Sequence, residues 1–154
     1  MKAGKVPATR AGARMVELGR EEALELLANV PLGRVGFTRQ ALPVIRPVNH
    51  LVHGGNVVIR THSGSGLLNR SLGPEVVAYE ADEIDPDTHT GWSVVLTGVA
   101  TRITDPDDLA RCQSLLVPWI DAEMAHMVRI VPELVTGYRL EAATSWARVG
   151  RPPP

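Results

Sequence analysis

The sequence predicts a mainly β protein of the α+β class, a small antiparallel barrel with short peripheral helices. Its apolar segments are short, and roughly five or six of them have the composition of strands. Only short turns join the first three of these strands. Parallel strands need a crossover of a dozen or more residues, so the first three form an antiparallel meander. Closure of that meander into a barrel removes its exposed edges.

Length and composition indicate one folded domain. The chain has 154 residues, of which 44% are hydrophobic and 21% are charged, and both fractions are ordinary. The net charge of −1 argues against a dedicated nucleic-acid binder, because such proteins are usually strongly basic. The single cysteine, Cys112, excludes an internal disulfide and a cysteine-cluster metal site. No apolar run approaches the ~20 residues of a membrane-spanning helix, so we expect a cytoplasmic protein without a membrane partner.

The two ends of the chain set the expected domain boundaries. Residues 1–15 are basic and rich in small residues, and they lack the apolar stretch of a secretory signal. We expect a flexible tail there, with a basic arm that touches nucleic acid as the alternative. Residues 146–154 contain a run of prolines and are expected to form a C-terminal extension. The folded domain is therefore expected to span residues 16–145.

The first half of the chain predicts one helix and three strands. Residues 20–30 predict the helix, because apolar side chains share one face and acidic residues lie near its start. A turn at Arg39-Gln40 follows the first strand, and Gly54-Gly55 is typical of a hairpin turn. Two prolines in the second strand favour a sheet edge, or a site where the backbone faces something other than a strand. The predicted strands are 34–38, 44–52 and 56–62.

The second half predicts a glycine-rich turn with a short helix at 63–72, then further strands and one more helix. Asp105 is expected to cap that last helix, with Pro106 at its first position. Pro132 is expected to separate the last two strand pieces. The predicted strands are 75–83, 92–104, 127–131 and 134–141.

The stretch from Arg60 to Gly66 is the first candidate for chemistry. It combines a cation, hydroxyl groups and glycines at a strand end before a helix, which favours a bound anion. Arg60 and Thr61 point to opposite faces of a regular strand, so both reach one phosphate only where the strand ends. An ordinary polar turn with a helix cap is the alternative. The pattern is neither a P-loop nor a dinucleotide-binding fingerprint.

Arg46 is the second candidate, because it lies in an otherwise apolar strand and therefore needs a partner. A phosphate or an acidic side chain would serve, and an internal ion pair is the alternative. His50 and His53 lie on opposite faces of one strand and cannot chelate one metal, so no metal site is expected. Trp92, taken alone, indicates a structural role.

Taken together, the motifs resemble the pyridoxamine 5′-phosphate oxidase-like family of FMN-binding proteins, in its branch that includes nitroimidazole-resistance proteins. The motifs are R-P-V-N-H at 46–50, R-T followed by G-S-G at 60–66, the acidic V-A-Y-E-A-D at 77–82, and G-W-S-V-V-L-T-G at 91–98. The resemblance covers residues 16–140. It implies a six-stranded antiparallel split β-barrel with short peripheral helices.

The resemblance also implies a homodimer with two flavin sites at the subunit interface, a small-molecule substrate, and FMN as cofactor, with a deazaflavin or haem as alternatives. The implied cofactor-binding residues are Arg46, Pro47, Val48 and Asn49 along the ring and ribityl chain, Arg60, Thr61, Ser63 and Ser65 at the phosphate, and Trp92 and Ser93 from the partner subunit. Members of the family commonly carry a phosphate-binding lysine where this chain has Gly66, and Arg70 is a candidate replacement.

The activity implied is that of a flavin- or deazaflavin-dependent oxidoreductase, with His50 as the candidate acid or base. Residues specific for pyridoxal-type substrates are not identifiable, so pyridoxamine phosphate oxidation itself is not expected. One alternative is a non-catalytic flavin-, deazaflavin- or haem-binding protein that acts as a sensor or scavenger. Another is a dimeric interaction protein without a cofactor, for which Gly66 is the main argument.

Overall fold

The protein is represented by a computed structural model, which describes residues 12–62, 66–67, 73–117 and 126–143. Seven strands and two helices are assigned in this part of the chain. The strands are β1 Arg14–Glu17, β2 Leu32–Arg39, β3 Leu42–His53, β4 Asn56–Thr61, β5 Glu75–Asp85, β6 Thr90–Arg102 and β7 His126–Glu141. The helices are α1 Arg20–Ala28 and α2 Pro106–Leu115.

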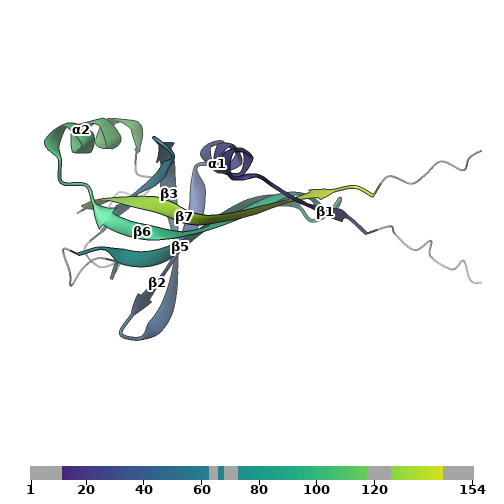
Figure 1. Cartoon of the computed structure of the whole chain (residues 1–154), viewed down its shortest axis with the longest axis horizontal. Coiled ribbons are helices and arrows are strands. Elements are labelled where there is room, and N and C mark those ends of the chain that lie inside the picture. The colour runs from purple at the N-terminus through teal and green to yellow at the C-terminus, as the bar shows by residue number, and fades with distance from the viewer. Residues whose placement is uncertain (1–11, 63–65, 68–72, 118–125, 144–154) are drawn as a thin grey trace, which may run out of the picture.

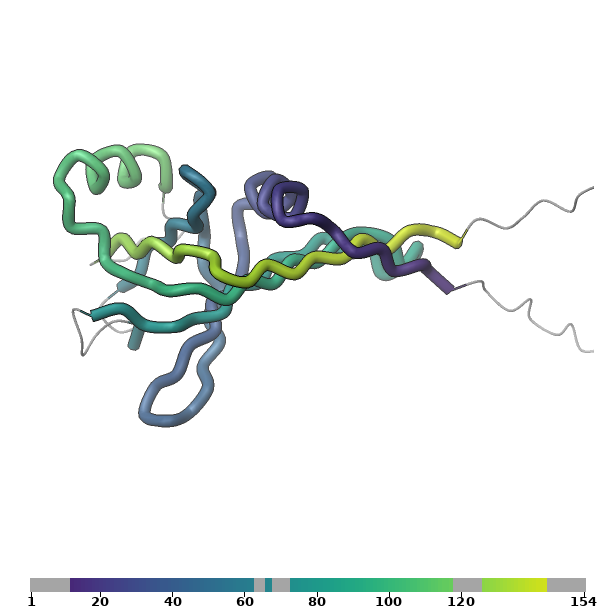
Figure 2. The backbone as a smooth tube through the Cα atoms, viewed as in Figure 1, coloured from purple at the N-terminus to yellow at the C-terminus, as the bar shows by residue number. Residues whose placement is uncertain are grey.

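Six strands close into a ring, which confirms the predicted six-stranded antiparallel barrel. Around the ring the order is β2, β3, β4, β7, β6 and β5, and β5 pairs back with β2. β1 adds a short strand to β7 outside the ring. In Figures 1 and 2 the β2–β3 hairpin projects from the barrel, while β1 and the end of β7 extend in another direction. The strand β1 begins at Arg14, within the segment that we expected to be a tail.

The last strand corrects one prediction, because β7 runs without interruption through Pro132. Its register with β6 shifts at this point: Gly98 pairs with Pro132, whereas Thr97 pairs with Leu134. Glu133 is therefore the extra residue of a β-bulge, which lets the strand continue past the proline. The expected break between two strand pieces was wrong for this reason.

The two hairpin turns differ in their residues. Gly54 and Gly55 have φ angles of 60° and 76°, which confirms the predicted turn between β3 and β4. The turn between β2 and β3 lies at Gln40 and Ala41, one residue later than predicted, with φ angles of 50° and 62°. Side-chain-bearing residues pay about 1–2 kcal/mol each in this left-handed region. The later turn leaves Arg39 as the last residue of β2.

Both helices begin as predicted. The Asp105 carboxylate accepts a hydrogen bond from the Asp108 amide at 3.0 Å, which caps α2. Cys112, on the inner face of α2, is buried with Leu116 in a small second core. The helix predicted within 63–72 lies outside the described residues. Neither described helix has the length and apolar character to cross a membrane.

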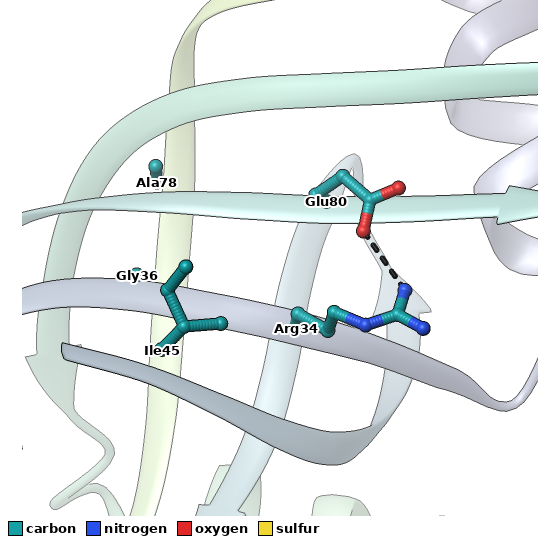
Figure 3. A pocket seen from close by; sticks show the side chains of 5 residues that line it. All are labelled: Arg34, Gly36, Ile45, Ala78 and Glu80. Atoms are coloured by element: carbon teal, nitrogen blue, oxygen red, sulfur yellow. Dashed lines mark hydrogen bonds and ion pairs between the residues drawn. The ribbon is translucent and has the colours of Figure 1, made fainter.

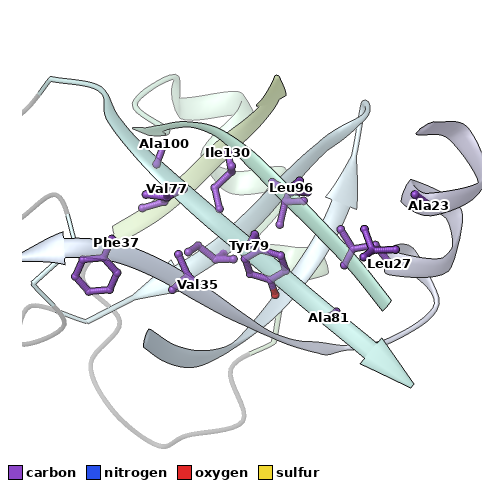
Figure 4. Close-up of a cluster of buried hydrophobic side chains, with 14 of the residues drawn as sticks. Ala23, Leu27, Val35, Phe37, Val77, Tyr79, Ala81, Leu96, Ala100 and Ile130 are labelled. Atoms are coloured by element: carbon purple, nitrogen blue, oxygen red, sulfur yellow. The ribbon is translucent and has the colours of Figure 1, made fainter. Parts of the chain in front are cut away.

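The main hydrophobic core fills the ring and extends under α1 (Figure 4). Alternate residues of each strand point inward, as the two-residue period of a strand requires. Ala23 and Leu27 bring α1 onto this core and are fully buried. The inward-facing strand residues labelled in the figure are Val35, Phe37, Val77, Tyr79, Ala81, Leu96, Ala100 and Ile130. The core thus fixes which side chains remain at the ends and outer face of the barrel.

Candidate functional site

The segment Arg46–Asn49 lies in the half of β3 that pairs with β2 alone, because β4 pairs only with residues 50–53. Arg46 and Pro47 are exposed, and Val48 and Asn49 are half-buried. None of the ion pairs between described residues involves Arg46, so the internal ion pair considered from the sequence is not formed. The hairpin projects from the barrel, and the guanidinium is therefore solvated rather than buried.

Arg60 and Thr61 are the last two residues of β4 and face opposite sides of the sheet, as the strand period predicts. The Nη1 atom of Arg60 donates to the carbonyl of Leu116, beyond the end of α2, at 3.3 Å. Thr61 is 5% exposed. Two of their polar atoms, Arg60 Nε and Thr61 Oγ1, are buried and have no hydrogen-bond partner among the described residues.

These two atoms test whether the end of β4 fits a phosphate. A buried polar group without a partner costs about 1–3 kcal/mol, so such groups usually mark a bound water, ion or ligand. Arg60 and Thr61 both offer donors, and phosphate oxygens are strong acceptors. The strand ends at Thr61, which is the condition under which both side chains reach one group. The two side chains thus offer donors at the end of β4, from opposite faces of the sheet.

Gly66 is described, whereas Ser63, Ser65 and Arg70 lie outside the described residues. Its φ angle is +85°, a conformation that favours glycine. A Cβ atom built on Gly66 would lie 2.9 Å from Cδ of Arg39 and 3.4 Å from its Nε and Nη1 atoms. The arginine side chain thus passes directly over the glycine. Sequence reasoning missed Arg39, because the contact joins β2 to a segment beyond β4 and leaves no local signal.

Trp92 and Ser93 lie on β6 and face opposite sides of it. Trp92 is 6% exposed and belongs to the main core, in keeping with the structural role that the sequence indicated for it alone. Ser93 is half-buried on the outer face. Their approach to a flavin from a partner subunit stays a prediction.

His50 is buried in a polar network inside the barrel. Its Nε2–H donates to the carbonyl of Leu27 at 2.7 Å, and its Nδ1 accepts from the hydroxyl of Tyr79. Burial lowers the pKa of His50, with the Leu27 hydrogen bond acting in the opposite direction. The neutral ring, with both nitrogens engaged, joins α1 to β3 and β5. This assigns His50 a structural role in place of the candidate acid or base.

Gly33 makes room for that network. A Cβ atom at this position would overlap the hydroxyl of Tyr79 and the backbone carbonyl of Glu80. The hydroxyl of Tyr79 also lies 3.4 Å from the carbonyl of Val48. Burial raises the pKa of Tyr79, so the hydroxyl remains a hydrogen-bond donor.

A shallow hollow of about 210 Å³ lies on the outer face of β2, β3 and β5 (Figure 3). Gly36 and Ala78 form its floor, and Ile45 stands at its side. Arg34 Nη1 and Glu80 Oε2 form an ion pair of 3.0 Å at one end. Ligand pockets usually hold roughly 300–1,000 Å³, so this hollow alone is too small for a whole flavin.

The carboxyl of Glu80, which lines the hollow, is perturbed by its neighbours. Burial and then the neighbouring carboxyl of Asp82 raise the pKa of Glu80, while Arg34 lowers it. Arg34 also approaches Asp82, at 3.8 Å. No group of three or more His, Cys, Asp or Glu side chains within the described ranges is arranged to hold a metal ion.

Comparisons with known proteins agree on one family. A family model described as pyridoxamine 5′-phosphate oxidase matches residues 19–139. An uncharacterised protein of Mycobacterium tuberculosis is 52% identical over 132 residues, which are 83% of this chain and 87% of that protein. A solved structure from Corynebacterium glutamicum, described as a candidate pyridoxamine 5′-phosphate oxidase, is 38% identical with a TM-score of 0.71 over 82% of this chain and 98% of that one. The FAD binding protein from Mycobacterium smegmatis is 35% identical with a TM-score of 0.67 over 82% of this chain and 99% of that one.

Proposed function

Because this chain belongs to the pyridoxamine 5′-phosphate oxidase family, we propose that it binds a flavin nucleotide and uses it to oxidise or reduce a small molecule. The observation that carries the proposal is the pair of buried, unpartnered atoms at the end of β4, Arg60 Nε and Thr61 Oγ1. A phosphate oxygen beyond the strand end would give such a donor the acceptor that the described residues lack. The similarity to solved structures also supports the proposal, since one protein with 35% identity is described as an FAD binding protein.

Arg60 and Thr61 would hold the phosphate, with Ser63 and Ser65 as further candidates from the sequence. The exposed half of β3, from Arg46 to Asn49, would lie along the ribityl chain and ring. When bound, the flavin supplies electron or hydride transfer, and the protein supplies binding and orientation. FMN is the cofactor we propose. FAD carries the same phosphate group and is the other flavin to test, with a deazaflavin third.

We also propose that the protein is a homodimer. Large apolar side chains share the outer face of the barrel around the hollow, and a soluble monomer rarely leaves such a patch uncovered. These residues are Ile45 at 70% exposure, Val76 at 69%, Val95 at 41% and Leu134 at 61%. A second copy would cover them and bring the partner's side chains to the flavin. An Ile45→Lys variant should shift the mass measured by light scattering from dimer to monomer and weaken flavin binding, whereas an unchanged dimer would contradict this face.

The visible absorption spectrum of the purified protein, followed by titration with FMN and FAD, tests the function. We expect flavin bands, or saturable fluorescence quenching at micromolar concentrations. A colourless protein that quenches neither flavin would refute the proposal and make a deazaflavin the next ligand. A Soret band would indicate haem instead.

A second candidate is a flavin-binding protein without turnover. It is favoured by one observation: His50, the one candidate acid or base in the sequence, has both ring nitrogens engaged in the core. Steady-state assays with NADH, NADPH and a reduced deazaflavin as electron donors separate the two candidates. Turnover with any donor supports an enzyme, and flavin binding without turnover supports a sensor or scavenger.

A further inference from the structure

Arg39 places a positive charge at the end of β2, beside Gly66. It is the last residue of β2, and Phe37 and Val35, two and four residues before it, occupy the same face of that strand. Both of those residues are buried in the core. Arg39 therefore turns toward the inner side of the sheet, but at the strand end its side chain reaches past the core and is exposed.

The side chain of Arg39 is held against the backbone of Gly66. Its Cδ atom would lie 2.9 Å from a Cβ on that residue, and its Nε and Nη1 atoms would lie at 3.4 Å. Any larger residue at 66 would have to push the guanidinium aside. The next residue, Leu67, is fully buried in the main core, so the glycine is anchored beside it. The contact is thus a defined juxtaposition of β2 with the segment that follows β4.

Arg39 is also an unused cation. It takes part in no ion pair or side-chain hydrogen bond among the residues described. A guanidinium presents several N–H donors in a planar fork, which matches the oxygens of a phosphate. Arg34, Arg129 and Arg139, in contrast, each face a carboxylate.

We infer that Arg39 is the cation of a phosphate site beside Gly66, at the end of β2. The phosphate belongs to the flavin nucleotide, so this inference rests on the function proposed above. Gly66 leaves the space that the guanidinium occupies, and its positive φ lets the backbone approach the anion closely. The charge is supplied from β2 rather than from the segment after β4.

Binding of FMN and of riboflavin, which lacks the phosphate, distinguishes this role from simple packing. We expect Arg39→Ala to weaken FMN binding by about ten- to a hundredfold, the range for loss of a charge-assisted hydrogen bond, and to leave riboflavin binding unchanged. Arg39→Lys keeps the charge but loses the fork, so its FMN affinity should fall between those of the wild type and Arg39→Ala. Arg111→Ala, at an exposed arginine on α2, is the matched control and should bind both ligands like the wild type.

Two results would overturn the inference. One is FMN affinity in Arg39→Ala that stays within about twofold of the wild type. The other is an equal loss of FMN and riboflavin affinity, which would mean that Arg39 only packs across Gly66.

A wild-type protein that binds neither FMN nor FAD would refute the proposed function, and the phosphate site would then be tested alone. In that case inorganic phosphate should raise the melting temperature of the wild type and of Arg111→Ala but not of Arg39→Ala. No phosphate effect in the wild type would remove the site as well.

Discussion

Tyr79→Phe tests the buried network that joins α1 to the barrel. The substitution keeps the ring, which is 1% exposed, and removes only the hydroxyl. The lost hydrogen bond leaves Nδ1 of His50 without a donor, at a residue that is 6% exposed. An unsatisfied buried acceptor costs about 1–3 kcal/mol, so we expect the free energy of unfolding to fall by about 2 kcal/mol. For a domain of this size that corresponds to a decrease in melting temperature of about 6 °C.

Urea denaturation followed by tryptophan fluorescence gives the free energy of unfolding for each variant. Tyr138→Phe is the matched control, because Tyr138 is 38% exposed, and it should change stability by less than about 0.5 kcal/mol. A double-mutant cycle with His50→Gln isolates the pair, since Tyr79→Phe should cost less once its partner is gone. The reasoning is refuted if Tyr79→Phe costs no more than the control, or costs as much in the His50→Gln background as in the wild type.

Four further predictions follow from single contacts. The folded-state pKa of His50 lies below 6.5, so the unfolded chain takes up a proton that the folded chain does not. The free energy of unfolding should therefore fall below pH 6.5 by up to about 1.4 kcal/mol per pH unit in urea titrations, and His50→Gln should flatten that fall; an equally steep fall in the variant would contradict it. Ala41→Gly should raise the free energy of unfolding by about 1 kcal/mol by relieving a φ angle of 62°, and a loss would contradict the turn geometry. Asp105→Ala should lower it by about 0.5–2 kcal/mol through loss of the α2 cap, and an unchanged denaturation midpoint would argue against that cap. Gly66→Lys should weaken rather than strengthen FMN binding, because the new side chain would displace Arg39 and the lysine backbone would have to adopt a positive φ. Tighter FMN binding would contradict the Arg39–Gly66 contact.

The sequence predicted the parts of the fold that depend on neighbouring residues. The cap and first turn of α2 follow from Asp105 and Pro106 alone, and the turn between β3 and β4 follows from two adjacent glycines. The antiparallel order of the first strands follows from turns that are too short for a crossover. Pro132 misled the prediction because a bulge at Glu133, which only the partner strand reveals, accommodates it.

The site was less predictable, because it depends on residues that are distant in sequence. The resemblance drew attention to Arg46 and Arg60, but only the fold shows that Arg46 is solvated while Arg60 is tied to the end of α2. His50 is engaged by a helix carbonyl and a tyrosine from other elements, which its own strand does not indicate. Arg39 and Gly66 are 27 residues apart in the sequence and meet only in the folded chain. Sequence patterns report local periodicity, whereas these contacts join residues of different elements and leave no periodic signal in the sequence.

The projecting half of β3 has a consequence for self-association. Among the described strands, residues 42–49 pair with β2 alone, so no described strand takes up the backbone groups on their other side. Pro43 and Pro47 pair with β2 four residues apart and carry no amide hydrogen, so the amides that would point to this open side are missing at both positions. Ile45 retains the amide between them. An incoming strand would therefore find a single donor where a continuous ladder needs three, and the hairpin can project from the barrel without serving as a template for fibrous aggregation.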